Sequence, residues 1–302
     1  MAGSGDTGAS RGDLRTRLLG GPCVLLDGGM GSRLLARGLE AGDAPERLNL
    51  DRPDVVTEAH AEYIAAGSEA VQTNTFGANP VRLAHFGLAD RCAAINHRAV
   101  GLARVAGPTF VIGDIGPTGE YLPPVGDGDL TRWLAAFSTQ ARALADAGVD
   151  AIHVETMSDL REATAALEAV RTRAPDLPVM VSLTFERRPR GVFTVLGDRL
   201  VDSLRQLLDC GATVVGANCS IASGAMRELA AEALAGVRGR LVFQPNAGQP
   251  EMTADGLRYA QDPVEFAADL LPVIHAGAAA VGGCCGTDPR FITALRRQMS
   301  SA

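Results

Sequence analysis

The sequence predicts a single α/β barrel of eight strand–helix units, a (β/α)8 fold. Two observations lead to this class. Eight short apolar runs recur along the 302 residues with helix-length segments between most of them, and a glycine precedes four of the runs at one fixed spacing. Strands that alternate with amphipathic segments form parallel sheets, and runs that are apolar almost throughout are typical of strands buried on both faces. The length also suits one large α/β barrel.

The predicted strands can be placed in chain order. They are VLLDGG from Val24, AVQTNTF from Ala70, FVIGDIG from Phe110, AIHVET from Ala151, VMVSLTF from Val179, TVVGANC from Thr213, LVFQPNAG from Leu241 and AAVGGCCG from Ala279. Helix starts agree with this spacing. Pro53 is suited to a first helical position, and Ser158 or Asp159 to an N-cap. Pro263, after Asp262, opens a further helix, whose last turn we expect Pro272 to distort.

A repeated glycine supports closure into eight units. The second, fourth, sixth and eighth runs each follow the pattern Gly-x-x-x-Val or Gly-x-x-x-Ile, with the glycines at 67, 148, 211 and 277. Each of these glycines comes after a helix-like stretch, where glycine adopts the left-handed conformation that ends a helix. Loops between helices and strands favour glycine in any case, but four evenly distributed copies indicate repeated βαβα quarters. We therefore expect one TIM barrel.

Residues 13–302 are expected to form this barrel, with no second domain. Residues 1–12 have no apolar core of the kind that a signal peptide carries, and we expect them to form a disordered lead. No apolar run reaches the roughly 18 residues of a membrane helix, so no membrane association is expected. The expected location is the cytoplasm, where cysteines remain thiols or bind metal.

The charged residues exclude several kinds of chemistry. The net charge is −7, and the acidic balance argues against a nucleic-acid surface. All 28 basic residues are arginine. A Schiff-base aldolase, a pyridoxal-phosphate enzyme and a P-loop nucleotide hydrolase each need a lysine amine, so all three classes are excluded.

Polar and glycine residues gather after the apolar runs, at the strand ends where barrel enzymes carry their active sites. Three cysteines are among them: Cys219 after the sixth run, and Cys284 and Cys285 after the eighth. Adjacent strand residues point to opposite faces, so both members of the Cys-Cys pair can face one centre only if the chain leaves strand geometry. Three converging thiolates would suit Zn²⁺ with an open fourth position. Inert buried cysteines or a vicinal disulfide remain alternatives.

Two carboxylates lie on the same predicted rim, Asp27 after the first run and Glu155 after the fourth. They would suit a cationic ammonium group, and the alternative is that they accept hydrogen bonds from nearby loop amides. His153 alternates with Glu155 and could point into the barrel, where a core histidine is favoured over a metal ligand. The glycine-rich DGGMGS after the first run lacks the patterns of a phosphate-binding loop.

From about Leu25 to Ile292, the sequence resembles the homocysteine S-methyltransferase family, and most of all the homocysteine-binding barrel of cobalamin-dependent methionine synthase. The resemblance rests on DGGMGS, QTNTFGAN, GDIGPTGE, VET, GANCS, PNAG and GGCCGT, which occur in this order. GANC followed by GGCCGT is the most specific part.

The resemblance implies a role for each matching residue. It implies that Cys219, Cys284 and Cys285 bind zinc, and that Asp27 and Glu155 hold the amino group of homocysteine or a similar small thiol. The backbone amides near Gly28 and Gly29 would face the substrate carboxylate. Three asparagines in matching motifs are expected as supporting substrate contacts: Asn74, Asn218 and Asn246.

The methyl donor is left open by the residues. TNTFGAN and GDIGPTGE resemble the cobalamin-dependent type, and Gly77 stands where betaine-dependent relatives carry a tyrosine. Because the chain has no room for the other domains of methionine synthase, we expect methylcobalamin to come from a separate corrinoid protein. Direct transfer from S-methylmethionine or another sulfonium is one alternative. A partner-dependent homocysteine-binding subunit without turnover of its own is another, and a metal-free barrel lyase is a third.

Overall fold

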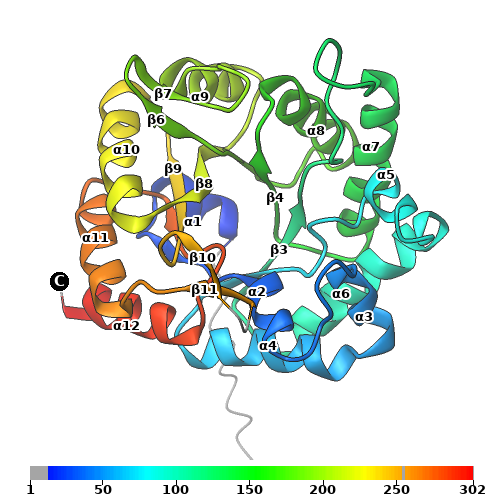
Figure 1. Cartoon of the computed structure of the whole chain (residues 1–302), viewed down its shortest axis with the longest axis horizontal. Helices are drawn as coiled ribbons and strands as arrows, with labels where there is room; N and C mark the ends of the chain where they lie inside the picture. The colour runs from blue at the N-terminus through cyan, green and yellow to red at the C-terminus, as the bar shows by residue number, and fades with distance from the viewer. Residues whose placement is uncertain (1–12, 254–255, 302) are drawn as a thin grey trace, which may run out of the picture.

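The computed structural model describes residues 13–253 and 256–301, so the predicted lead at 1–12 lies outside the described residues. The predicted barrel is present (Figure 1). Eight parallel strands form one sheet in the order β1-β12-β9-β8-β5-β4-β3-β2. Their bounds are β1 Val24–Leu25, β2 Ala70–Gln72, β3 Phe110–Ile115, β4 Ala151–Met157, β5 Val179–Leu183, β8 Val214–Ala222, β9 Leu241–Asn246 and β12 Ala280–Val281.

The sheet closes between its first and last strands, β1 and β2. The backbone N–H of Glu69 donates to the carbonyl of Leu25 at 2.8 Å, and the Glu69 carboxylate accepts from the Leu25 N–H at 3.1 Å. Higher up, the N–H of Gln72 donates to the side chain of Asp27 at 3.0 Å. Because β1 and β2 are short, few backbone hydrogen bonds join them. The side chains of Glu69 and Asp27 supply the remaining hydrogen bonds that close the barrel.

Helices surround the barrel and cover its outer face (Figure 1). Their bounds are α1 Leu14–Gly20, α2 Met30–Leu35, α3 Leu48–Asp51, α4 Pro53–Ala65, α5 Pro80–Ala84, α6 Cys92–Val105, α7 Leu130–Asp146, α8 Leu160–Arg173, α9 Leu200–Asp209, α10 Ser223–Gly236, α11 Pro263–His275 and α12 Pro289–Ser301, with short 3-10 turns η1 Pro45–Arg47 and η2 Ala89–Arg91.

The helix boundaries follow the sequence signals. Gly67, Gly148, Gly211 and Gly277 all have positive φ and lie one residue past the C-caps of α4, α7, α9 and α11. The predicted starts at Pro53 and Pro263 are confirmed, and the side chains of Asp159 and Asp262 cap α8 and α11. Helix α11 continues three residues beyond Pro272, to His275.

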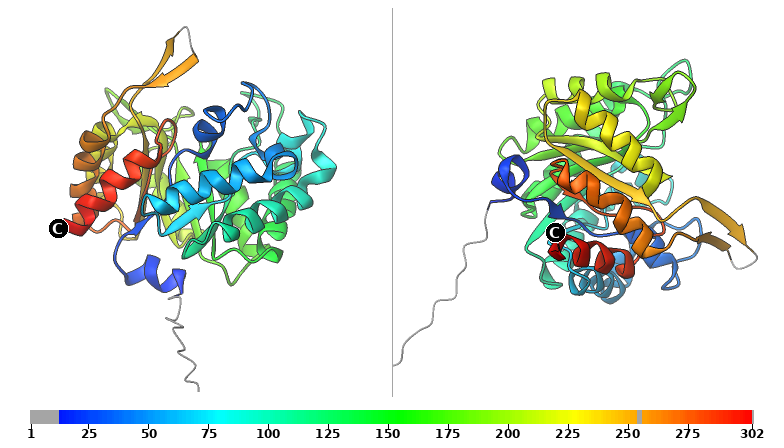
Figure 2. Two further views of the ribbon diagram at one scale, coloured as in Figure 1. Left: turned by 90° about the horizontal axis from the view of Figure 1, so that it is seen from below. Right: turned by 90° about the vertical axis from the view of Figure 1, so that its left-hand side faces the viewer.

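The lower half of the barrel interior is apolar and closed. Helix α1 lies across the N-terminal end of the strands (Figure 2), where the buried Leu14 and Leu18 join a cluster drawn from all eight strands. Each strand contributes at least one side chain to this floor, among them Ala70, Ile112, Ala151, Met180 and Val242. The floor seals this end of the barrel among the described residues.

Above the floor, the interior becomes polar. Side chains two residues apart on a strand face the same side. The positions two residues beyond the five floor residues named above are therefore the next inward layer, and they are Gln72, Asp114, His153, Ser182 and Gln244. All five are buried. The fold thus brings a ring of hydrogen-bonding groups directly beneath the strand ends.

Two antiparallel hairpins interrupt the regular alternation. Strands β6 Glu186–Arg188 and β7 Gly191–Phe193 pair after β5, and β10 Pro250–Thr253 and β11 Gly256–Tyr259 pair after β9. The second hairpin projects from the end of the barrel opposite α1 (Figure 2). At its base Tyr259 packs against Gly286, where a Cβ would lie 2.1 Å from the tyrosine Cγ.

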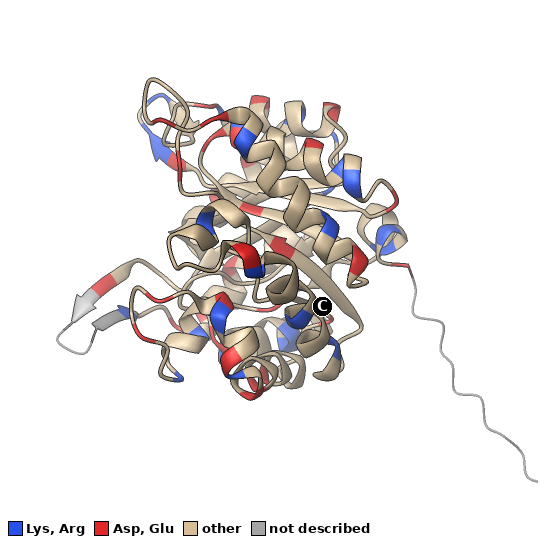
Figure 3. Cartoon of the chain, turned by 90° about the vertical axis from the view of Figure 1, so that its right-hand side faces the viewer, with Lys and Arg blue, Asp and Glu red and all other residues tan. Residues whose placement is uncertain are grey.

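Arginine and acidic residues are interspersed over the helices on the side of the molecule seen in Figure 3. Many of them form ion pairs, such as Arg37 with Glu58 at 2.7 Å and Arg104 with Asp150 at 2.8 Å. Within the described ranges, no helix combines the length and the apolar character needed to cross a membrane.

Candidate metal and substrate site

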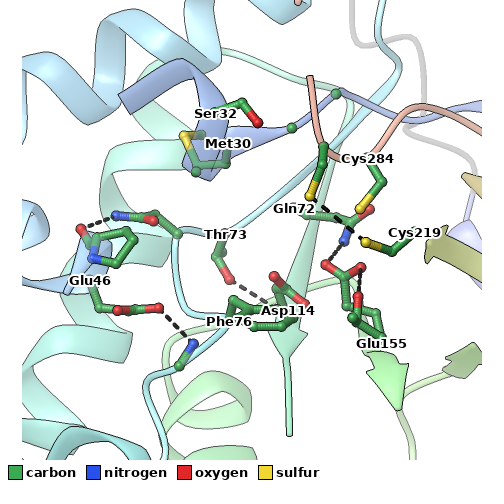
Figure 4. A pocket seen from close by; sticks show the side chains of 18 of the residues that line it. Met30, Ser32, Glu46, Gln72, Thr73, Phe76, Asp114, Glu155, Cys219 and Cys284 are labelled. Carbon is green, nitrogen blue, oxygen red and sulfur yellow. Dashed lines mark hydrogen bonds between the residues drawn. The ribbon is translucent and has the colours of Figure 1, made fainter. Parts of the chain in front are cut away.

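A pocket of about 370 Å³ opens at the C-terminal ends of the strands, above the polar layer. Its wall brings together eight of the ten residues predicted from the sequence: Asp27, Gly28, Gly29, Asn74, Glu155, Cys219, Cys284 and Cys285. The other two, Asn218 and Asn246, are buried and do not line it. Figure 4 shows Cys219 and Cys284 on one side of the pocket, with Gln72 and Glu155 beside them and Asp114 next to Glu155.

The three rim cysteines converge. Their Sγ atoms all lie within 4.8 Å of one another, and those of Cys219 and Cys285 are 3.8 Å apart. Tetrahedral zinc with Zn–S bonds of about 2.3 Å requires sulfurs about 3.8 Å apart. All three side chains are free thiols of intermediate exposure. The donor set and its spacing therefore fit a tetrahedral thiophilic metal with one position left open toward the pocket.

The backbone leaves strand geometry to achieve this. Cys219 and Ser220 have φ values of +60° and +62°, which non-glycine residues seldom adopt. Cys284 and Cys285 lie in the loop after β12. This loop forms backbone hydrogen bonds with the end of β9 and the residue that follows it. There the Cys284 N–H donates to the Pro245 carbonyl at 2.8 Å, and the Ala247 N–H donates to the Cys285 carbonyl at 3.0 Å. This strain at the cysteines is typical of functional sites.

The three sulfurs also share protons. Hydrogen bonds from the thiols of Cys219 and Cys284 lower the pKa of Cys285 to about 3. Cys285 is therefore the most acidic of the three thiols. A thiolate is the form of cysteine that ligates metal.

Asp27 and Glu155 are buried and face the pocket. Asp27 accepts from the Gln72 N–H with one oxygen, and its Oδ1 has no hydrogen-bond partner. Glu155 accepts from Gln72 Nε2 at 3.2 Å and from Asn218 Nδ2. Burial raises the pKa of Asp27 well above its usual range and that of Glu155 to about 7. A cation entering the pocket would offset the cost of burying both carboxylates.

A network fixes the amide of Asn218. Its Oδ1 accepts from the Thr156 N–H and from Ser182 Oγ, each at 2.8 Å, so its Nδ2 must face Glu155. Because Ser182 donates its single proton to Asn218, the 2.9 Å contact with His153 requires Nε2–H of the histidine to donate to Ser182. His153 thus points into the barrel, as predicted, and supports Asn218.

A second chain of hydrogen bonds, through Gln244 and Gln72, also holds the Glu155 carboxylate. Gln244 Nε2 donates to Gln72 Oε1 at 2.7 Å and to the Gly283 carbonyl at 3.3 Å, and Gln72 in turn holds Glu155. Sequence reasoning missed Gln72, Ser182 and Gln244. The signal available was a polar residue at an inward position of an otherwise apolar strand.

Of the other residues predicted to contact substrate, Gly29 and Asn74 form hydrogen bonds within the protein. The N–H of Gly29 already donates to Thr287, at 3.1 Å to both the carbonyl and Oγ1. Asn74 donates to the Pro45 carbonyl and to Asn49 Oδ1, which fixes the segment that forms one wall of the pocket. Asn246 Oδ1 is buried without a partner. Substrate contact through these residues stays a prediction.

The fold and the site together define a class: a (β/α)8 barrel with a cluster of three cysteines that could hold a metal and that lines a small-molecule pocket. The match to known families is more specific. Residues 24–299 match the family model described as homocysteine S-methyltransferase. The chain therefore belongs to the homocysteine S-methyltransferase family, a family of methyltransferase enzymes, as the sequence motifs predict.

Individual relatives agree. The chain is 34% identical over 287 residues to the methionine synthase of Mycobacterium tuberculosis and 32% identical to that of Mycobacterium leprae. These matches cover 88% of the chain but 24% and 23% of the relatives, so the chain spans about a quarter of their length. The metallated form of the homocysteine methyltransferase MmuM from Escherichia coli superposes with a TM-score of 0.75 at 28% identity, over 91% of this chain and 96% of that one.

Proposed function

We propose that this chain is a zinc-dependent S-methyltransferase that transfers a methyl group to the thiol of homocysteine and gives methionine. One observation carries the proposal. Three cysteine sulfurs within 4.8 Å of one another and two buried carboxylates without cationic partners line a single small pocket. An amino acid with a thiol can occupy the open metal position and place its ammonium group against Asp27 and Glu155.

The residues of the chain divide the work of such a reaction. Cys219, Cys284 and Cys285 would hold zinc, which when bound would act as a Lewis acid that lowers the pKa of a substrate thiol. Asp27 and Glu155 bind the ammonium group and so fix the direction of the sulfur. The thiol proton leaves to solvent on binding. The sulfur then forms its bond to the methyl carbon as the bond from that carbon to the donor breaks, and no protein base is required.

For the donor, we favour methylcobalamin carried by a separate corrinoid protein. The support is the resemblance of TNTFGAN and GDIGPTGE to the cobalamin-dependent type, together with the matches to methionine synthases. A cytoplasmic location would suit the three thiols, because that compartment keeps cysteines reduced.

One observation favours a second candidate, a small sulfonium such as S-methylmethionine. The wall of the pocket also carries the buried carboxylate of Glu46 and the ring of Phe76. Glu46 accepts from the Gly77 N–H at 2.6 Å, which holds it in place. A carboxylate and an aromatic face both attract a cationic methyl donor.

A donor panel tests the proposal. The zinc-loaded protein would be assayed for methionine with homocysteine and one of three donors: free methylcobalamin, a methylated corrinoid protein or S-methylmethionine. Turnover only with the corrinoid protein would support the favoured donor, and turnover only with the sulfonium the second candidate. Homocysteine binding without turnover would indicate a partner-dependent binding subunit. A protein that binds neither zinc nor homocysteine would contradict the proposal.

A further inference from the structure

Asp114, near the end of β3, is a further carboxylate in the pocket wall, and the proposed function above gives it no role. The residue is 5% exposed, and it lines the same pocket as the cysteines. Figure 4 shows it facing the pocket on the same side as Glu155. Its Oδ1 is buried and accepts no hydrogen bond from a described N–H or O–H donor, and the Asp114 and Glu155 carboxyls lie close enough to share a proton.

The backbone of Asp114 is held firmly. Its N–H donates to Thr73 Oγ1 at 3.0 Å, and its carbonyl accepts from Thr75 Oγ1 at 2.7 Å and from Gln140 Nε2 at 3.2 Å. Gln140 Nε2 also donates to the Thr75 carbonyl at 2.7 Å. Four hydrogen bonds therefore hold together the ends of β2 and β3 and fix the backbone from which the Asp114 side chain enters the pocket wall.

The buried polar atoms of the pocket wall that lack a hydrogen-bond partner are all of one chemical kind. Among the described lining residues, the buried polar atoms without a partner are Asp27 Oδ1, Asp114 Oδ1 and Gln244 Oε1, and all three are hydrogen-bond acceptors. Arg82 also lines the pocket, but none of the carboxylates Asp27, Asp114 and Glu155 forms an ion pair with a described arginine or histidine. Burial and the nearby carboxylate of Glu155 raise the pKa of Asp114. The wall is thus suited to an occupant that is cationic and donates several hydrogen bonds.

We propose that Asp114 completes the ammonium site: its Oδ1 accepts one N–H of the substrate α-ammonium group that Asp27 and Glu155 also face. An ammonium group has three N–H donors, and three carboxylates can receive them. Asp114 then acts as a specificity-determining residue, because it favours thiols that carry a free α-amino group over thiols that lack one. This inference rests on the proposed function, since it takes homocysteine as the substrate.

The test compares homocysteine with 4-mercaptobutanoate, which is homocysteine without its amino group. The dissociation constant of each would be measured calorimetrically on the zinc-loaded protein. Asp114→Asn removes the charge and keeps the size. We expect it to weaken homocysteine binding by about tenfold or more, the range of a hydrogen bond to a charged group, and to leave 4-mercaptobutanoate unchanged or bound more tightly. Asp127→Asn, on an exposed carboxylate of the loop before α7, is the matched control and should change neither constant.

The outcomes separate the two proposals. If the wild-type protein binds zinc but not homocysteine, the proposed function fails. If it binds homocysteine and Asp114→Asn weakens both thiols equally, or neither, the role of Asp114 is overturned. Should Asp114→Asn fail to fold, a crystal structure of the wild-type protein with zinc and homocysteine decides the matter. The ammonium nitrogen should then lie within about 3.2 Å of Asp114 Oδ1, and a separation beyond about 4 Å would refute the contact.

Discussion

The Sγ atoms of Cys219 and Cys285 lie 3.8 Å apart although 66 positions separate the residues in the chain. Their strands are not neighbours, because β9 lies between β8 and β12. The sulfurs meet above the end of β9 because Cys219 takes a left-handed backbone conformation and because the loop after β12 is fastened to Pro245 and Ala247. The cysteine cluster is therefore a property of three adjacent strand ends, and it depends on their backbone contacts as much as on the cysteines themselves.

Replacing one sulfur should abolish metal binding. We expect Cys219→Ser to lower the zinc content well below one ion per chain and to reduce methyl transfer by about 100-fold or more, because two thiolates do not make a closed zinc site. Metal analysis and a methionine assay would show both effects. Cys210→Ser is the control, since Cys210 is exposed at the end of α9 and should keep full zinc. Full zinc in the Cys219→Ser protein would rule out this ligand set and revive a metal-free reaction.

Gly29, which is the N-cap of α2, and Gly31, in the first turn of α2, provide a matched pair of variants. A Cβ at Gly29 would lie 2.5 Å from the Cys284 carbonyl oxygen, whereas a Cβ at Gly31 would meet nothing within 4 Å. Gly29→Ala should push the cysteine loop outward and weaken zinc binding by about 10- to 100-fold, as losses around a metal site commonly do. Gly31→Ala should bind zinc normally. Competition with a chromophoric chelator would measure both affinities, and equal affinities would disprove the steric argument.

The support behind Glu155 should be measurable through Ser182. Ser182→Ala leaves the Nε2–H of His153 buried without an acceptor and takes one donor from Asn218. We expect the free energy of unfolding to fall by about 1–3 kcal/mol. Homocysteine binding should also weaken several-fold, because the Asn218 amide no longer has a fixed direction toward Glu155. Denaturant unfolding and calorimetry give the two quantities. Lower stability with unchanged binding would show that the network is structural only.

A buried acid outside the pocket should make stability depend on pH. Glu162 on α8 accepts from the N–H of Thr118 at 2.7 Å and from its hydroxyl, and burial raises its pKa from 4.5 to about 7. The folded state therefore binds the proton more tightly than the unfolded state, so stability is highest at low pH and is lost as pH rises through this window.

The size of this loss follows from the shift. A change from 4.5 to about 7 corresponds to about 3 kcal/mol between pH 4 and pH 8. Glu162→Gln, which can still accept from Thr118, should remove that much of the pH dependence. Urea unfolding of both proteins at pH 5 and pH 8 provides the comparison. Parallel pH profiles would mean that Glu162 is ionised in the folded protein.

The repeating part of the fold could be predicted because its signals are local. The glycines at 67, 148, 211 and 277 end helices through their own backbone freedom, and an apolar run identifies a strand without reference to its neighbours. The hairpins β6–β7 and β10–β11 and the α1 floor were not predicted. Each depends on packing against the completed barrel, as when Leu14 and Leu18 meet side chains from all eight strands.

The residues of the site also fall into a group that the sequence predicted and a group that it did not. Cys219, Cys284, Cys285, Asp27 and Glu155 stand in distinctive motifs at strand ends, and the structure places them in one pocket. Ser182 and Gln244 stand in no quoted motif, and Gln72 and Asp114 stand within QTNTFGAN and GDIGPTGE without being singled out there. Their importance follows from which side chains face one another across the barrel, and this depends on strand register. A search for polar residues two positions beyond the inward apolar layer would have found all four.

The floor made by α1 also sets an order of events. Leu14 and Leu18 close the lower end of the barrel, so the pocket is entered and left from the side of the strand ends. Under the proposed function, the thiol occupies the depth of this pocket beside the cysteines, and the methyl donor must approach above it. A donor that arrived first would stand between the entering thiol and the cysteines. The kinetic mechanism should therefore be compulsory: the thiol is the first to enter, and its methylated product is the last to depart.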